Sequence, residues 1–162
     1  MSDDLDIVRR YRHSLPIDLE AIFSDLRIHY EERPMPKGHS GRIDYREPFC
    51  TVTVNSNEGV QRRRFTAAHE LGHYILHRDL LMSGEGHLDR LFENGGNSNP
   101  FAPLSDKHEV QANQFAADLL MPESTLRLLY EPDRDNVIDL AKLCEVSYKA
   151  MEIRLRSLGI RP

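Results

Sequence analysis

The sequence predicts an α+β fold, in which a short antiparallel or mixed sheet packs on two long helices and a C-terminal helical extension follows. Three observations predict this class. The run Phe49–Val54, directly after Pro48, is rich in β-branched residues and is typical of a strand. Apolar residues at helical spacing then extend over about Gly59–His77. A second helical pattern covers Asp106–Met121 and is stopped by Pro122.

The composition is that of one globular domain with a sizeable core: 162 residues, of which 40% are hydrophobic and 29% charged. The net charge of −5 argues against a protein that coats nucleic acid in general. No apolar run approaches the ~18 residues of a membrane span, and the acidic N-terminus does not resemble a signal peptide. Cys50 and Cys144 lie far apart, so we expect buried free thiols in a reducing, cytoplasmic compartment.

The elements before the first long helix are short. Residues 1–16 are polar and mixed in charge, and no element is predicted there. A helix is expected over Ile17–Leu26, followed by a strand at 28–30. A turn-rich segment precedes a second strand at 42–45, and Phe49–Val54 is the third. Two or three strands therefore lead into the first long helix.

The first long helix carries three features with structural consequences. The segment Asn55–Asn57 offers side chains that could cap its N-terminus. Arg62–Arg64 is interpreted as a solvated first turn, because three consecutive charges spread around a helix. Gly72 costs about 1 kcal/mol relative to alanine in a helix interior. We therefore expect another backbone to pack closely against Gly72.

The segment 78–104 is rich in glycine, asparagine and proline and predicts a loop, with a short helical turn at Leu88, Leu91 and Phe92. Because long loops in compact domains are usually functional, we interpret it as a flap near the active site. The second long helix, which follows it, is apolar nearly all round after Ala112 and should be buried.

Three further helices are expected after Pro122, over Glu123–Tyr130, Val137–Cys144 and Ser147–Leu158. We divide the chain into a core at 1–122 and a C-terminal helical extension at 123–162 that packs on the core. The apolar residues expected inside the extension are Val146, Met151, Ile153, Leu155 and Leu158.

One motif carries chemistry. His69-Glu70-Leu71-Gly72-His73 has the pattern H-E-x-x-H of zinc metalloproteases. Two histidines four residues apart lie about one turn apart on one helix face, where a single ion can accept both. Glu70 points about 100° away from His69, which suits a base that acts on a water better than a metal ligand. Catalytic zinc takes three protein ligands, so a third must come from elsewhere.

Glu109, at the start of the second long helix, would complete a His2Glu set. The spacing Asp106-x-x-Glu109 also matches a capping box, so the residues alone leave both interpretations open. Asn113, one turn later, could orient a ligand through a hydrogen bond. His77 is too far along the axis and is expected to be a cap or a hydrogen-bonded histidine, and His87 lies in the loop.

Two blocks resemble the ImmA/IrrE family of metallopeptidases: Phe65–His73 and Glu109–Pro122. The resemblance covers roughly residues 17–160 and is more specific than H-E-x-x-H alone. It implies a small zincin-like metallopeptidase with a gluzincin-like site.

By this resemblance the zinc ligands are His69, His73 and Glu109, and Glu70 is the catalytic base. The expected reaction is zinc-dependent hydrolysis of a peptide bond. The expected substrate is a helix-turn-helix repressor in a mobile-element or stress-response switch. An oxyanion-stabilising group is also required, with three candidates: Tyr45, His108 and Tyr148. The strand Thr51–Asn55 could pair with an extended substrate if it lies at a sheet edge.

Two other functions remain open at this point. The segment Leu140–Ala150 resembles a helix-turn-helix, and five basic against two acidic residues give +3 between Lys142 and Pro162. The extension could therefore dock on DNA or on a repressor, with the metal site structural or of minor activity. The competing interpretation is a helical hairpin that packs on the core. A metal-dependent hydrolase of a small-molecule amide is the third possibility.

Overall fold

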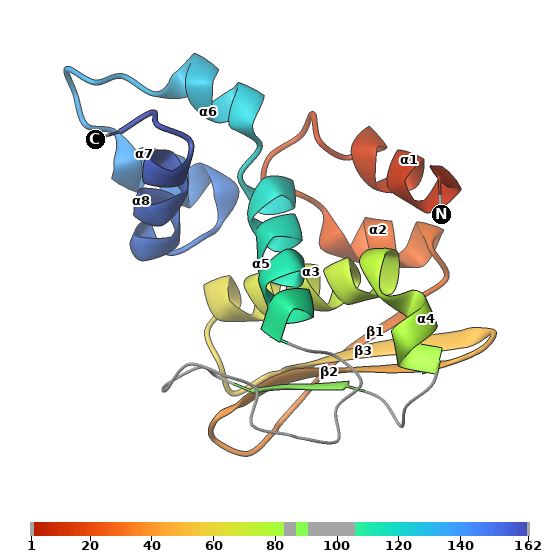
Figure 1. Ribbon diagram of the computed structural model, residues 1–162. Coiled ribbons are helices and arrows are strands. Elements are labelled where there is room, and N and C mark those ends of the chain that lie inside the picture. Colours follow the sequence, from red (N-terminus) through yellow and green to blue (C-terminus); the bar gives the residue numbers. More distant parts are fainter. Residues whose placement is uncertain (1, 83–86, 91–105, 162) are drawn as a thin grey trace.

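The computed structural model describes residues 2–82, 87–90 and 106–161, and it confirms the α+β class (Figure 1). Its elements, in chain order, are α1 Ser2–Arg10, α2 Leu19–Asp25, β1 His29–Arg33, β2 His39–Arg46, β3 Phe49–Asn55, α3 Val60–Leu76, α4 Arg78–Met82, β4 His87–Arg90, α5 Asp106–Leu120, α6 Glu123–Leu129, α7 Val137–Cys144 and α8 Tyr148–Ser157. No described helix is both long and apolar enough to cross a membrane.

The sheet is mixed, with the strand order β1-β3-β2-β4. β3 is parallel to β1 and antiparallel to β2, and β4 is antiparallel to β2. Val52 pairs with Tyr30 of β1 on one side and Ile43 of β2 on the other. The expectation that Thr51–Asn55 pairs with a substrate is therefore wrong, because β1 and β2 already use both sides of this strand.

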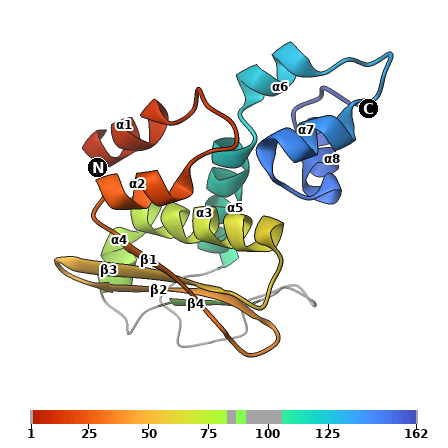
Figure 2. The ribbon, with the colours of Figure 1, turned by 180° about the vertical axis from the view of Figure 1, so that it is seen from behind.

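The first long helix, α3, lies between the sheet and the helices α1 and α2, and α5 packs across it (Figures 1 and 2). Every residue from Thr66 to Ile75 is buried, as expected for a helix that is covered on several sides. This position explains why its sequence shows small and polar residues instead of one apolar stripe.

The helix α5 packs closely against Gly72 of α3. A Cβ atom added to Gly72 would lie 3.2 Å from the Cα of Ala112 and 3.2 Å from the Cβ of Phe115. The predicted close backbone is confirmed, and it belongs to α5. The small residues Ala112 and Ala116 are both fully buried on this helix, so the two helices meet over a surface of little side-chain volume.

The start of α3 differs from the prediction. Its N-cap residue is Gly59, which makes no side-chain capping bond. Asn55 instead donates to the carbonyls of His39 and Met35 and accepts from the amide of Asn57. Asn55 thereby connects the end of β3 to the loop before β2 and to the start of β2. Its buried side-chain amide is satisfied by backbone groups, as buried polar groups usually are.

The arginines 62–64 are not a solvated turn. Arg62 donates to the Ser40 hydroxyl at 3.1 Å. Arg64 donates to the Ile17 carbonyl at 2.9 Å and lies 3.3 Å from a carboxylate oxygen of Glu145. These contacts connect α3 to β2, to the segment before α2 and to the C-terminal helices.

Two segments predicted without structure contain elements. The helix α1 was not predicted, and it is stabilised by tertiary contacts: Val8 is buried, and Asp4 pairs with Arg78. In the expected loop, Arg78–Met82 is helical and Leu88 belongs to β4 instead of a helical turn. Leu91, Phe92 and most of the expected flap lie outside the described residues.

The C-terminal extension contains the expected helices. Val146, Met151 and Leu155 are buried as predicted, but Ile153 is 56% exposed, so its placement in the core was wrong. Its position on α8 faces outward because the buried face is taken by Met151 and Leu155. Arg154 joins this extension to the end of α5, since it donates to the Met121 carbonyl at 3.0 Å. The boundary between 122 and 123 stays a prediction.

Both cysteines are buried free thiols, as expected. Burial raises the pKa of Cys50 to about 12 and that of Cys144 to about 11. Neither thiol is therefore poised to act as a nucleophile near neutral pH.

Candidate metal centre

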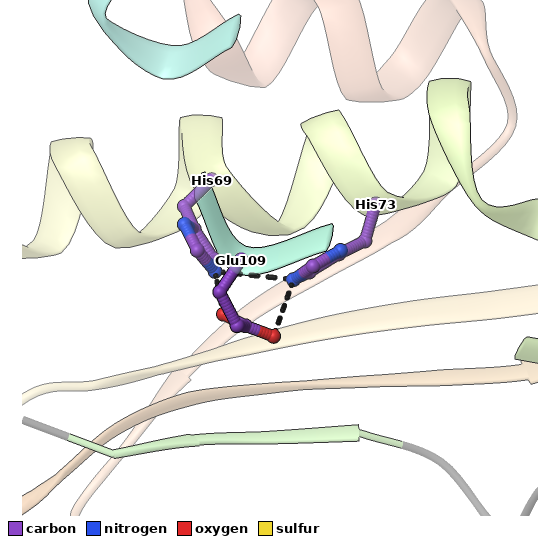
Figure 3. A group of neighbouring side chains, drawn as sticks. All are labelled: His69, His73 and Glu109. Atoms are coloured by element: carbon purple, nitrogen blue, oxygen red, sulfur yellow. Dashed lines mark hydrogen bonds and ion pairs between the residues drawn. The ribbon is translucent and has the colours of Figure 1, made fainter. Parts of the chain in front are cut away.

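Three side chains from two helices converge below α3. His69 and His73 leave α3 toward the sheet, and the Glu109 carboxylate of α5 lies beneath them (Figure 3). One ligand atom from each residue lies within 4.8 Å of the others. The carboxylate oxygens of Glu109 are 2.9 Å from Nε2 of His69 and 3.2 Å from Nε2 of His73. All three residues are buried.

The tautomer of His69 follows from its second ring nitrogen. Nδ1 of His69 lies 2.7 Å from Oδ1 of Asn113. An amide oxygen only accepts, so Nδ1 carries the hydrogen and Nε2 presents a lone pair to the cluster. Asn113 therefore holds the ring of His69 through a hydrogen bond, and its role in orienting a metal ligand stays a prediction.

The tautomer of His73 is set through a second histidine. His77 Nε2 lies 2.7 Å from Oε1 of Gln111, so this nitrogen donates and Nδ1 of His77 is left as an acceptor. Nδ1 of His73 lies 3.0 Å from that acceptor and donates to it. Nε2 of His73 then presents a lone pair toward Glu109. His77, as expected, is a hydrogen-bonded histidine at the helix end.

Sequence reasoning missed Gln111. In the sequence, Gln111 resembles any polar residue on an exposed helix face. No spacing rule links it to His77, which lies on another part of the chain. Only the contact between α3 and α5 brings them together, and a polar residue close in sequence to Glu109 was the single available signal.

The donor set fits a zinc ion. The two Nε2 atoms are 3.1 Å apart, and both face a carboxylate. With both Nδ1 atoms protonated, the cluster consists of acceptors that point into one small volume, which a cation stabilises. Two imidazoles and one carboxylate are also a known arrangement for catalytic zinc. His69, His73 and Glu109 are the residues that would hold the ion.

Glu70 follows His69 on α3 and is completely buried. The role of Glu70 as a catalytic base stays a prediction, based on its place beside His69 in the motif.

The sequence also offered His87 as a ligand candidate, and Tyr45, His108 and Tyr148 as oxyanion-stabilising groups. The ring of His108 is 4.7 Å from that of His77, between ring centroids. Tyr45 packs on Tyr74, and Tyr148, the first residue of α8, is half exposed. The backbone of His87 pairs with β2. The oxyanion-stabilising residue stays a prediction.

Comparison with known proteins relates the whole site to one family. The family model of the IrrE N-terminal-like domain matches residues 23–156. Metallopeptidase ImmA of Bacillus subtilis (strain 168) is 33% identical over 87 residues, which are 54% of this chain and 44% of that protein. Uncharacterized immunity region protein 2 of Bacillus phage phi105 is 27% identical over 126 residues, 72% of this chain and 65% of that protein.

The matched segments cover less than two thirds of either relative. The family match nevertheless contains the H-E-x-x-H motif, the whole of α5 and nearly all of the C-terminal helices. Because this match covers most of the sequence, the chain belongs to the ImmA/IrrE family.

Proposed function

We propose that the chain is a zinc-dependent endopeptidase. The convergence of His69, His73 and Glu109 carries this proposal, because the hydrogen bonds around the cluster leave only acceptors for a cation. Family membership supports a peptidase, and the relative from Bacillus subtilis bears the name metallopeptidase.

The protein groups divide the chemistry between them. A bound zinc ion would supply a Lewis acid that polarises the scissile carbonyl and acidifies a water. Glu70 takes the proton of the attacking water and delivers it to the leaving amine. Asn113 and His77 hold the two imidazoles in fixed orientations, so the ligands need no reorganisation during the reaction.

The proposed substrate is a helix-turn-helix repressor in a mobile-element or stress-response switch. This part rests on the family resemblance, and the name of the phage relative, an immunity region protein, supports it. We also propose a cytoplasmic location, since two buried free thiols suit a reducing compartment.

We propose that residues 1–122 form the zincin-like peptidase core and that 123–162 form a helix-turn-helix-like hairpin packed on it. The charges of the hairpin disfavour the DNA-binding alternative. Lys149 and Arg156 both pair with Glu152, and Arg154 pairs with Asp118 at 2.8 Å. Cations that are already paired are poorly placed to neutralise phosphates.

The test is incubation of the zinc-loaded chain with candidate repressors encoded beside it. We expect cleavage by the wild type. Glu70→Gln should retain zinc and lose about 10²–10⁴-fold in rate, the usual contribution of a general base. Equal cleavage by Glu70→Gln would assign the activity to another residue or to a contaminating protease.

A further inference from the structure

An apolar cleft adjoins the candidate metal centre. It has a volume of about 410 Å³ and lies between α3, α5 and α8. His69 and Asn113 line it, so one wall of the cleft is a candidate zinc ligand and its hydrogen-bond partner. A cavity of this size accommodates the side chains of a peptide.

Most of the exposed surface that lines this cleft is apolar, and two of its large apolar side chains are exposed. Val110 is 66% exposed and Ile153 is 56% exposed, and both line the same cleft as His69. Phe65 and Ala150 continue the apolar surface into a second hollow of about 360 Å³ at the start of α8. The two hollows adjoin, because they share four lining residues: Arg62, Phe65, Ala150 and Ile153.

All the acid–base groups other than His69 that line the two hollows are basic: Arg62, Lys149 and Arg154. Lys149 and Arg154 are paired with carboxylates, whereas Arg62 donates to the Ser40 hydroxyl, at 3.1 and 3.3 Å, and this hydroxyl in turn donates to Glu58. A guanidinium with a neutral partner at an apolar cleft is complementary to a carboxylate.

We propose that this cleft binds the substrate peptide beside the scissile bond, with a large apolar side chain against Ile153, Val110 and Phe65 and an acidic residue near Arg62. The proposal rests on the proposed function and adds a substrate class to it. Ile153 is then a specificity-determining residue, which explains why an isoleucine on α8 is exposed instead of joining the core of the extension.

The test separates binding from cleavage. The zinc-loaded Glu70→Gln chain, immobilised, selects ligands from a displayed library of random peptides. We expect enrichment of Leu, Ile, Met or Phe together with a nearby Asp or Glu. The same selection with Ile153→Glu added should weaken the apolar preference on the order of tenfold or more and favour Lys or Arg at that position. Arg62→Gln should remove only the acidic preference.

The matched control is Ile138→Glu, because Ile138 is 57% exposed on α7 and does not line the cleft. It should leave the selected motif unchanged. Ala150→Phe, which narrows both hollows, should shift the preference toward smaller side chains. Retained zinc and an unchanged circular dichroism spectrum establish that each variant is folded.

Three outcomes would overturn the proposal. The first is that no peptide motif is enriched. The second is that Ile153→Glu selects the same motif as the parent chain. The third is that the wild type self-associates and Ile153→Glu abolishes this, which would make the cleft an interface between copies of the chain. Failure of the proposed function is distinct: the wild type would then bind the selected peptides without cleaving them.

Discussion

The helix pair α3–α5 buries polar side chains between its members, whereas the pair α7–α8 buries apolar ones. Between α3 and α5 lie two imidazoles, their hydrogen-bond partners and the Glu109 carboxylate. Between α7 and α8 lie side chains such as Leu140, Met151 and Leu155, and the charges of the pair are used in surface ion pairs.

The candidate site therefore lies in the helix pair that retains buried polar groups. Buried polar groups are costly unless they are satisfied, so a pair of helices that retains several of them needs a compensating interaction. Between α3 and α5 a metal ion would supply it. The α7–α8 pair needs none, and its exposed Ile153 lies in the cleft that we propose binds a substrate peptide. The following predictions test this contrast.

The largest effect is expected from Glu109→Ala. Removal of the carboxylate should abolish stoichiometric zinc in elemental analysis after dialysis, a loss larger than the roughly 10–100-fold typical of residues that only orient a ligand. Glu123→Ala is the control, because Glu123 is exposed on α6 and pairs with Arg127. Full zinc in Glu109→Ala would identify Glu109 as a helix cap.

A smaller loss is expected from Gln111→Leu. Without the amide oxygen, His77 no longer has a fixed tautomer and His73 loses its orientation, so zinc affinity should fall about 10–100-fold. Competition with a chelator measures it. Gln114→Leu is the control, since Gln114 donates to Asp118 on the same helix. Equal affinities in the two variants would show that the relay through His77 does not matter.

The next effect concerns stability. Gly72→Val should lower the free energy of unfolding of the metal-free chain by about 1–3 kcal/mol, because the added atoms overlap α5. Urea denaturation measures it. Gly59→Ser is the control, because a Cβ at Gly59 would meet no atom within 4 Å. Serine is also a good N-cap residue, so the free energy of unfolding should be unchanged or higher. A tolerated Gly72→Val would contradict the close packing.

The smallest effect is expected in the α7–α8 pair. The double variant Arg156→Gln and Arg161→Gln removes two surface ion pairs, with Glu152 and Asp135, each worth about 0–1 kcal/mol, and should leave zinc content and cleavage unchanged. The wild type should give no mobility shift with duplex DNA at low salt. A salt-dependent shift that the double variant abolishes would restore the DNA-binding interpretation.

Much of the fold followed from local pattern. The strand Phe49–Asn55 and the helices α3 and α5 were predicted within a few residues, because β-branched runs and helical spacing are local signals. The parallel pairing of β1 with β3 was not specified, since strand pairing depends on contacts distant in sequence. The helix α1 was missed for the same reason: it is stabilised by burial of Val8 and by the Asp4–Arg78 pair.

By itself, the sequence determined the first half of the site. The period of an α-helix places His69 and His73 on one face and turns Glu70 aside, whatever the rest of the chain does. Only the tertiary structure placed Glu109 against both imidazoles, connected Gln111 to His73 through His77, and left Ile153 exposed in the cleft that His69 also lines. These relations join residues on different helices, so only the packing of α5 and α8 against α3 creates them.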